Sequence, residues 1–150
     1  MTNRPTPDPR TAYRHFRRIE TRWRDNDAYG HVNNVTYYSY FDTVVNEHLI
    51  RVGGLDIDRS PSIGLVVETS CTFRKSLSFP DVVDACLRVE KIGTSSVVYE
   101  IALFRAADDD AAAVGRFVHV WVDRESRRSV HVPDAIRAAL APLCKTTGVS

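Results

Sequence analysis

One long stretch of the chain carries hydrophobic residues at the spacing of an α-helix, three and four positions apart. It predicts a helix over residues 34 to 52, about 28 Å long. The covered face of this helix would consist of Tyr37, Tyr40, Phe41, Val44, Val45, His48 and Val52. We expect the helix to end there because Gly53 and Gly54 follow, and glycine accepts the left-handed conformation that closes many helices.

Five further segments alternate between apolar and polar residues, which is typical of strands with one covered face. They are residues 18–24, 65–73, 83–90, 97–104 and 115–123. The last is apolar on both faces, so we expect it to cover an edge of the sheet. A short second helix should begin at Pro133 and end near Leu143. Five antiparallel strands around one long helix predict an α+β architecture.

The length of the chain fits a single domain. A chain of 150 residues can bury about 70% of the surface that it exposes when unfolded. We expect this domain to cover residues 13–145. A disordered or extended arm over residues 1–12, with proline at positions 5, 7 and 9, would precede it, and a tail over residues 146–150 would follow.

Charge and cysteine content exclude several classes of protein. The 20 basic and 19 acidic residues nearly cancel, which argues against a nucleic-acid-binding protein with a strongly basic face. No segment approaches the ~20 consecutive apolar residues of a membrane span, and the N-terminus does not resemble a signal peptide. The 3 cysteines are too few for a disulfide framework. We therefore expect a cytoplasmic protein in a reducing compartment.

A cluster of polar residues lies where the first strand meets the long helix. It contains Asp25, Asp27, His31, Asn33 and Asn34. Backbone N–H groups in the first turn of a helix lack intrahelical partners, so they can stabilise a developing negative charge. Each residue alone has a structural explanation, since asparagine commonly caps a helix and aspartate commonly occupies a turn. Their combination favours a catalytic site.

The cluster resembles the active-site segment of a known family. Residues 23–37 read Trp-Arg-Asp-Asn-Asp-Ala-Tyr-Gly-His-Val-Asn-Asn-Val-Thr-Tyr. This segment resembles hotdog-fold acyl-CoA thioesterases of the 4-hydroxybenzoyl-CoA thioesterase family and the related plant acyl-carrier-protein thioesterases. Residues 73–81 and 89–96 agree more loosely, so the resemblance covers roughly residues 13–140. It implies a hotdog fold, hydrolysis of an acyl-CoA substrate, and a homodimer or homotetramer with active sites at subunit interfaces.

The resemblance also implies roles for individual residues. The catalytic aspartate of the family falls on Asp27, and Asp25 becomes a supporting residue. In the plant branch a histidine matching His31 takes part, with an asparagine where this chain has Tyr29. The bacterial branch, in which the aspartate works with a helix N-terminal amide, is therefore the better guide. That amide would belong to Asn34 or Val35, and Asp27 could either attack the carbonyl or deprotonate a water.

Further residues are candidates for binding the substrate. Tyr37, Tyr38 and Phe41 could line an acyl pocket, although Tyr37 and Phe41 would serve equally well as core. Arginine and lysine bind phosphate, so the CoA phosphates could meet Arg74, Lys75, Arg127 and Arg128. The other candidates near the substrate are Tyr29, Gly30, Asn33, Val35 and Glu68, of which Glu68 is a strand residue that is equally well explained as solvated. A single histidine beside aspartates does not indicate a metal site, and the chemistry requires no cofactor.

Two other reactive side chains have structural explanations. Cys71 shares a strand face with Phe73 and is expected to be a small core residue rather than a nucleophile. His119 lies within an apolar strand and is expected to be a buried structural histidine. The rival functions are a hotdog dehydratase, a non-catalytic acyl-CoA sensor and a thioesterase that acts on acyl-carrier protein. A sensor would need an added DNA-binding helix-turn-helix, for which residues 1–12 are too few.

Overall fold

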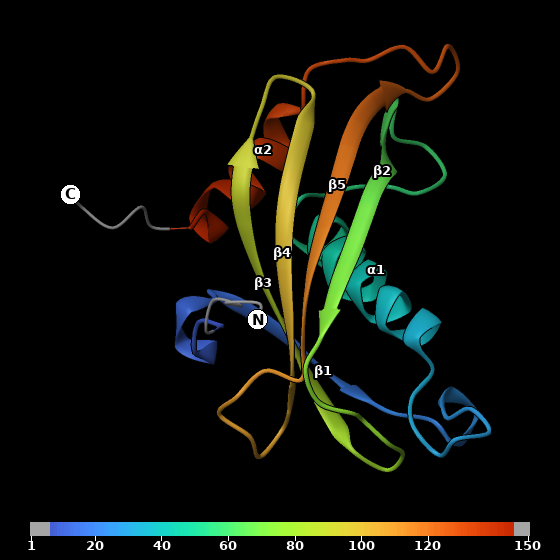
Figure 1. The fold of residues 1–150 in the computed structure, drawn as a ribbon. Coiled ribbons are helices and arrows are strands. Elements are labelled where there is room, and N and C mark those ends of the chain that lie inside the picture. The colour runs from blue at the N-terminus through green and yellow to red at the C-terminus, as the bar shows by residue number, and fades with distance from the viewer. Residues whose placement is uncertain (1–6, 146–150) are drawn as a thin grey trace, which may run out of the picture.

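The computed structural model describes residues 7–145 of the chain, which form one antiparallel sheet and two α-helices. The strands and helices, in chain order, are β1 His15–Glu20, α1 Asn34–Arg51, β2 Ser62–Phe73, β3 Val82–Ile92, β4 Ser96–Arg105, β5 Ala113–Asp123 and α2 Asp134–Leu140. Short 3-10 helices cover Arg10–Ala12, Trp23–Asp25 and Ala141–Leu143. The strand order in the sheet is β1-β3-β4-β5-β2, and all neighbours are antiparallel (Figure 1).

The predicted α+β architecture is confirmed, with five antiparallel strands and a helix packed against them. Helix α1 contains 18 residues, so it is of moderate length rather than unusually long. It ends one residue before the predicted position, and Gly54 beyond it has a positive φ of 71°. The second helix is also present, with Pro133 as its N-cap residue.

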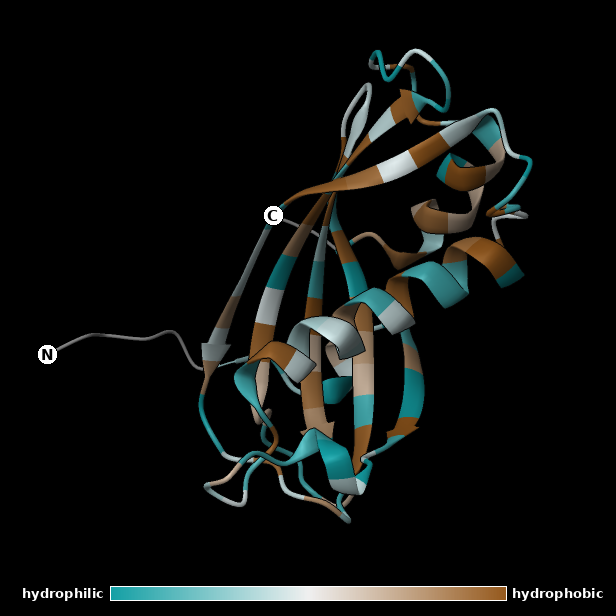
Figure 2. Ribbon diagram, turned by 90° about the vertical axis from the view of Figure 1, so that its right-hand side faces the viewer, coloured by the Kyte–Doolittle hydropathy of each residue, from teal (hydrophilic) through white to brown (hydrophobic). Residues whose placement is uncertain are grey.

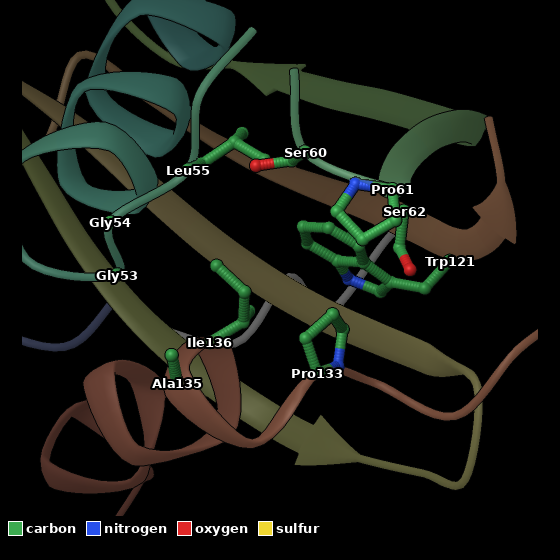
Figure 3. Close-up of a pocket in the computed structure, with 10 residues that line it drawn as sticks. All are labelled: Gly53, Gly54, Leu55, Ser60, Pro61, Ser62, Trp121, Pro133, Ala135 and Ile136. Carbon is green, nitrogen blue, oxygen red and sulfur yellow. The ribbon is translucent and has the colours of Figure 1, made fainter.

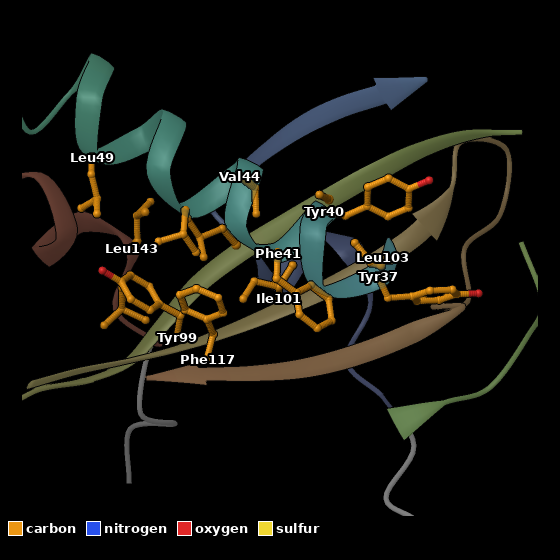
Figure 4. Close-up of a cluster of buried hydrophobic side chains, with 14 of the residues drawn as sticks. Tyr37, Tyr40, Phe41, Val44, Leu49, Tyr99, Ile101, Leu103, Phe117 and Leu143 are labelled. Atoms are coloured by element: carbon orange, nitrogen blue, oxygen red, sulfur yellow. The ribbon is translucent and has the colours of Figure 1, made fainter. Parts of the chain in front are cut away.

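Helix α1 lies across one face of the curved sheet (Figure 2). Its buried side chains, among them Phe41 and Val44, pack against inward-facing residues of β4 and β5 such as Ile101 and Phe117 (Figure 4). The close approach of the helix depends on Gly115, because a Cβ atom there would lie 2.3 Å from the ring of Phe41. The helix therefore fills the concave side of the sheet along most of its length.

The prediction that the last strand covers an edge of the sheet is wrong. Strand β5 lies between β4 and β2, and the two edges are formed by β1 and β2. The central position explains the hydrophobic residues on both faces of β5, because α1 covers one face and neighbouring side chains shield much of the other. The apolar pattern thus indicated burial on both faces. Burial of this kind occurs in a central strand as well as in an edge strand that another element covers.

The first strand also begins and ends earlier than predicted. Strand β1 covers His15–Glu20, whereas the alternating pattern predicted residues 18–24. The backbone N–H of Arg22 donates a 2.8 Å hydrogen bond to the carboxylate of Asp25, which folds Trp23–Asp25 into a 3-10 helix. The alternation of apolar and polar residues in the sequence therefore continues past the end of the strand. The side chain of Trp23 is 75% exposed.

The segment before β1 is more ordered than expected. Residues Arg10–Ala12 form a 3-10 helix, and the Asp8 carboxylate pairs with Arg88 at 2.6 Å. Arg10 pairs with the buried carboxylate of Asp84 at 2.7 Å. These ion pairs connect residues 8 and 10 to strand β3, and the extended backbone at Pro9 leads into the 3-10 helix. Residues 1–6 and the predicted tail 146–150 lie outside the described residues.

A β-bulge in β2 changes which side chains face the helix. Val66 is opposite His119 and Thr69 is opposite Phe117, so the register shifts between Val66 and Glu68. Residues directly opposite one another point to the same face of an antiparallel sheet. Val66 therefore shares the helix-facing side with Thr69, although strict alternation from the sequence placed these two residues on opposite faces.

Candidate functional site

The polar cluster forms a hydrogen-bonded turn between β1 and α1. The N–H of Asp27 donates to the carbonyl of His31 at 2.9 Å, and the N–H of Gly30 donates to the carbonyl of Asp27 at 3.0 Å. Gly30 has a φ of 84°, a conformation that glycine adopts without strain. The Ser78 hydroxyl donates to the Gly30 carbonyl at 3.0 Å, which fixes the turn against the β2–β3 connection.

The start of α1 distinguishes between the two amides proposed from the sequence. The side chain of Asn33 caps the helix, accepting a 2.9 Å hydrogen bond from the N–H of Val35. The Val35 amide is therefore engaged. The Asn34 N–H has no hydrogen-bond acceptor among residues 7–145. Of the two amides, that of Asn34 is the one available to a ligand.

A surface hollow of about 320 Å³ opens beside this turn. We call it the Asp27 hollow, and it is lined by Asp27, Tyr29, His31, Val32, Asn34, Tyr37, Phe73, Arg74, Lys75 and Ser76. The turn and the first turn of α1 form one side, and the end of β2 with the residues after it forms the other. Two segments more than 30 residues apart in sequence thus meet at one candidate site.

The two aspartates of the turn have different environments. Asp25 is only 3% exposed, and its carboxylate accepts hydrogen bonds from the Tyr40 hydroxyl at 2.9 Å and from the backbone and guanidinium of Arg22. Desolvation raises the pKa of Asp25, but these hydrogen bonds outweigh it and hold the pKa below its usual value. Asp27 lines the hollow instead, and its carboxylate accepts one hydrogen bond, from the Tyr29 N–H at 2.9 Å.

The inner end of the Asp27 hollow is aromatic. Tyr37 is 2% exposed, its ring lies edge-on to Phe73 with a centroid separation of 4.9 Å, and its hydroxyl accepts a hydrogen bond from the Leu77 N–H. Tyr38 packs edge-on against Phe41 and does not line the hollow. Phe41 is fully buried in the core. Of the three proposed acyl-pocket residues, only Tyr37 therefore reaches the hollow in this chain.

The proposed phosphate-binding residues lie in two separate places. Arg74 and Lys75 line the Asp27 hollow, and both pair with the carboxylate of Asp110. Arg128 lies beyond the opposite end of β5, where its carbonyl accepts from the N–H of Asp123. Strand β5 contains 11 residues, so about 35 Å of strand separates its two ends. Arg127 and Arg128 are thus remote from the hollow within one chain.

Glu68 is also outside the Asp27 hollow. It is opposite Val118 in the sheet, on the face away from α1, and its carboxylate pairs with Arg116. Gly30, Asn33 and Val35 belong to the turn and helix cap without lining the hollow. Conversely, no pattern in the sequence singled out Val32, Phe73 or Ser76 individually. Phe73 and Ser76 are the sequence neighbours of Arg74 and Lys75, and this position could have identified them as candidates.

The two structural interpretations of reactive side chains are confirmed. Burial raises the pKa of the Cys71 thiol to about 12, which disfavours the thiolate needed for nucleophilic attack. His119 is 1% exposed, and a 3.3 Å hydrogen bond joins its Nδ1 to the Tyr99 hydroxyl. Burial lowers the pKa of His119 to about 4, so this histidine is neutral at pH 7.

A second hollow, of about 150 Å³, lies near the C-terminal end of α1 (Figure 3). Its lining comes from the residues after α1, the start of β2, and the first turn of α2, together with Trp121. It contains glycine, proline, serine and hydrophobic side chains and no titratable group. This hollow offers neither an acid nor a base, so it provides no catalytic chemistry of its own.

Two further features bear on the class of protein. Within residues 7–145, no three side chains of His, Cys, Asp or Glu come together in an arrangement that could hold a metal ion. No helix in the same range is long and apolar enough to cross a membrane.

Comparison with known proteins places the chain in a family. Residues 21–140 match the thioesterase-like superfamily, so the chain belongs to that superfamily. The PA5185 protein of Pseudomonas aeruginosa is 52% identical, and the match covers 95% of this chain and 99% of that one with a TM-score of 0.92. The PA2801 protein of the same organism, provisionally assigned as a thioesterase, is 34% identical over 83% of this chain and 96% of that one, with a TM-score of 0.79.

A more distant relative shares the fold. A 1,4-dihydroxy-2-naphthoyl-CoA thioesterase from Synechocystis is 15% identical over 85% of this chain and 96% of that one, with a TM-score of 0.77. The sheet and helix are consistent with the hotdog fold of thioesterases. Family membership and these neighbours identify the protein as a thioester hydrolase.

Proposed function

We propose that the protein hydrolyses acyl-CoA thioesters to a carboxylic acid and CoA, with Asp27 as the catalytic carboxylate. The observation that carries this proposal is the contrast between the two acids of the turn. The carboxylate of Asp25 is buried and held by Tyr40 and Arg22, whereas the carboxylate of Asp27 lines the hollow. This contrast supports Asp27, rather than Asp25, as the acid that would meet a substrate carbonyl there.

The chemistry can follow two balanced routes. In the first, Asp27 attacks the thioester carbonyl, the C–S bond breaks, CoA leaves as a thiolate, and water hydrolyses the resulting anhydride. In the second, Asp27 takes a proton from water while the water oxygen attacks the carbonyl, and the tetrahedral intermediate then breaks its C–S bond. CoA leaves as a thiolate, and the proton held by Asp27 passes to the thiolate or to solvent. Either route needs little help for the leaving group, because a thiol has a pKa near 8.5.

The start of α1 supports stabilisation of the oxyanion. Asn34 lines the hollow, and its N–H lies at the positive end of the helix dipole. Loss of one oxyanion donor typically slows an enzyme by ~10²–10³-fold. His31 lines the same hollow and would orient the water or the thioester. Arg74 and Lys75 would meet the phosphates of CoA.

The exposed edge of the sheet supports a homodimer. Strand β2 has 12 residues and, within residues 7–145, pairs with β5 alone. Its Val66 and Val67 are 46% and 58% exposed. Long unpaired edges of this kind favour pairing with another chain. In a two-fold antiparallel pairing of β2 with a second copy, the Ser62 end of one strand would run beside the Phe73 end of the other. The second copy's Arg128 would then approach the Asp27 hollow.

A thiol-release assay tests the proposed function. Short, medium, long and aromatic acyl-CoA thioesters are each offered, together with the matching acyl-carrier-protein thioesters. Release of CoA from at least one acyl-CoA, faster than from its carrier-protein counterpart, is the expected result. Release from carrier-protein thioesters alone would assign the enzyme to the other substrate class. Tight binding of acyl-CoA without any release would instead identify a non-catalytic sensor.

A further inference from the structure

Two cations at the mouth of the Asp27 hollow share a single acidic partner. Arg74 Nη1 donates to Asp110 Oδ1 at 3.0 Å, and Lys75 Nζ lies 3.4 Å from Asp110 Oδ2. Arg74 Nη1 also donates to the carbonyl of Ala111 at 3.1 Å. One carboxylate therefore bridges both cations, with one oxygen directed at each.

The backbone brings these three side chains together. The N–H groups of Arg74 and Lys75 both donate to the carbonyl of Ala112, at 2.8 and 3.0 Å. These bonds tie the end of β2 to the acidic loop between β4 and β5. Desolvation works to raise the pKa of Asp110, but the hydrogen bond from Lys75 and the charges of Arg74 and Lys75 lower it, so the carboxylate is ionised at neutral pH.

The ion pairs of Asp110 with Arg74 and Lys75 are exposed enough for another anion to replace the carboxylate. The side chain of Asp110 is 51% exposed, and those of Arg74 and Lys75 are 29% and 39% exposed. Ion pairs with this exposure contribute little to folding stability. Within the part of the chain that the structure describes, only Nη1 of the Arg74 guanidinium has a hydrogen-bond partner, so its other N–H groups are available to an anion.

We propose that Arg74 and Lys75 form an anion site in which Asp110 is the resident occupant, and that a phosphate group of the CoA thioester displaces it. The inference rests on the proposed function, because the incoming anion belongs to the substrate. A terminal phosphate monoester, such as the one on the ribose of CoA, carries more charge and more acceptor oxygens than a carboxylate. Its oxygens also suit the planar donors of arginine. Asp110 thereby acts as a specificity residue, because its carboxylate excludes weakly binding anions from the site but is displaced by a phosphate.

The test compares Asp110→Asn with the matched variant Asp109→Asn. Asp109 is the exposed neighbour of Asp110 and makes no ion pair with any residue from 7 to 145, so both variants remove one charge from the same loop. Removing the competing carboxylate should lower the KM for an acyl-CoA by about 3- to 10-fold, with kcat unchanged. The KM for the matching N-acetylcysteamine thioester, which lacks phosphate, should not change. Asp109→Asn should behave as wild type on both substrates.

Each other outcome overturns the inference. A higher KM in Asp110→Asn would mean that Asp110 orients the two cations, and an unchanged KM would mean that no phosphate binds there. An equal fall in the KM of Asp109→Asn would mean that the effect comes from the overall charge of the loop. An equal fall in the KM for the phosphate-free thioester would mean that the effect does not depend on phosphate.

Calorimetry with CoA alone separates this inference from the proposed function. An inactive protein whose Asp110→Asn variant still binds CoA more tightly than wild type would retain the anion site without the hydrolysis.

Discussion

At the scale of single residues, the site depends on a difference between two acids two positions apart. The buried acid, Asp25, holds the turn to α1 through the Tyr40 hydroxyl, and its backbone carbonyl accepts from the N–H of Asn33. The acid that lines the hollow, Asp27, accepts a hydrogen bond from the Tyr29 N–H alone among the described residues. We interpret Asp25 and Tyr40 as positioning residues, because they contact the turn and the helix cap but not the hollow.

Substitution of Tyr40 by phenylalanine tests this positioning role. Tyr40→Phe removes one donor to a buried carboxylate, which should lower the free energy of unfolding by about 1–3 kcal/mol. If the turn also loses its alignment, kcat should fall by about 10-fold with little change in KM. Tyr38→Phe is the matched control, because the Tyr38 hydroxyl makes no hydrogen bond with the described residues. Equal effects of the two variants on kcat would contradict the role of Tyr40.

Some site residues could be predicted from the sequence and others could not. The Asp25–Asn34 cluster was recognisable because a turn before a helix places its residues close together whatever the rest of the fold does. Arg74 and Lys75 could be proposed only from their positive charge. Asp110 could not be connected with them, since three consecutive aspartates in a loop are equally consistent with a solvated surface.

At the scale of elements, hydrophobic periodicity predicted where the strands and helices lie in the sequence. It did not predict which strands pair with one another in the sheet. Strand β5 was correctly recognised as buried on both faces but was assigned to an edge, because periodicity reports burial and not pairing partners. The bulge between Val66 and Glu68 has no sequence signal such as glycine, so the alternation that is correct for Cys71 and Phe73 assigned the residues before the bulge to the wrong faces. The ordered segment before β1 depends on ion pairs to residues more than 70 positions away.

The burial of His119 in β5 predicts a pH-dependent stability. Its folded-state pKa, about 4, lies below the ordinary value of 6.5, so the unfolded chain binds more protons between these pH values. Stability should therefore fall as the pH falls from 6.5 to 4, by up to about 3 kcal/mol from this group. Urea unfolding at pH 7 and at pH 4.5 measures the loss, and His119→Gln should reduce it. The same pH dependence in wild type and His119→Gln would contradict this assignment.

At the scale of the whole molecule, one chain leaves large hydrophobic side chains uncovered beside the site. Tyr29 and Val35, in the turn and first turn of α1, are 87% and 73% exposed, and Val67 on the edge strand is 58% exposed. Exposed hydrophobic groups of this size commonly mark an interface. A second copy paired along β2 would cover the edge and bring its Arg128 towards the Asp27 hollow.

Disruption of the β2 edge tests the dimer. Val67→Lys places a charge on the exposed edge, and it should give a monomer in sedimentation experiments with a loss of most thioesterase activity. Val52→Lys is the control, because Val52 is 60% exposed but belongs to the C-cap of α1 and makes no strand pairing in the sheet. Dilution of wild type should reduce activity and stability together, since assembly and folding are linked by mass action. A wild-type monomer with full specific activity at nanomolar concentration would contradict the interface.

The most direct test of the central claim is thiol release by Asp27→Asn under saturating acyl-CoA. The variant removes a charge and keeps the shape of the side chain, including an oxygen that can accept from the Tyr29 N–H. If Asp27 is the catalytic carboxylate, kcat should fall by at least ~10²-fold, equivalent to about 2.7 kcal/mol of activation free energy, with folding and acyl-CoA binding retained. Near-wild-type turnover by folded Asp27→Asn would remove Asp27 from the catalytic role.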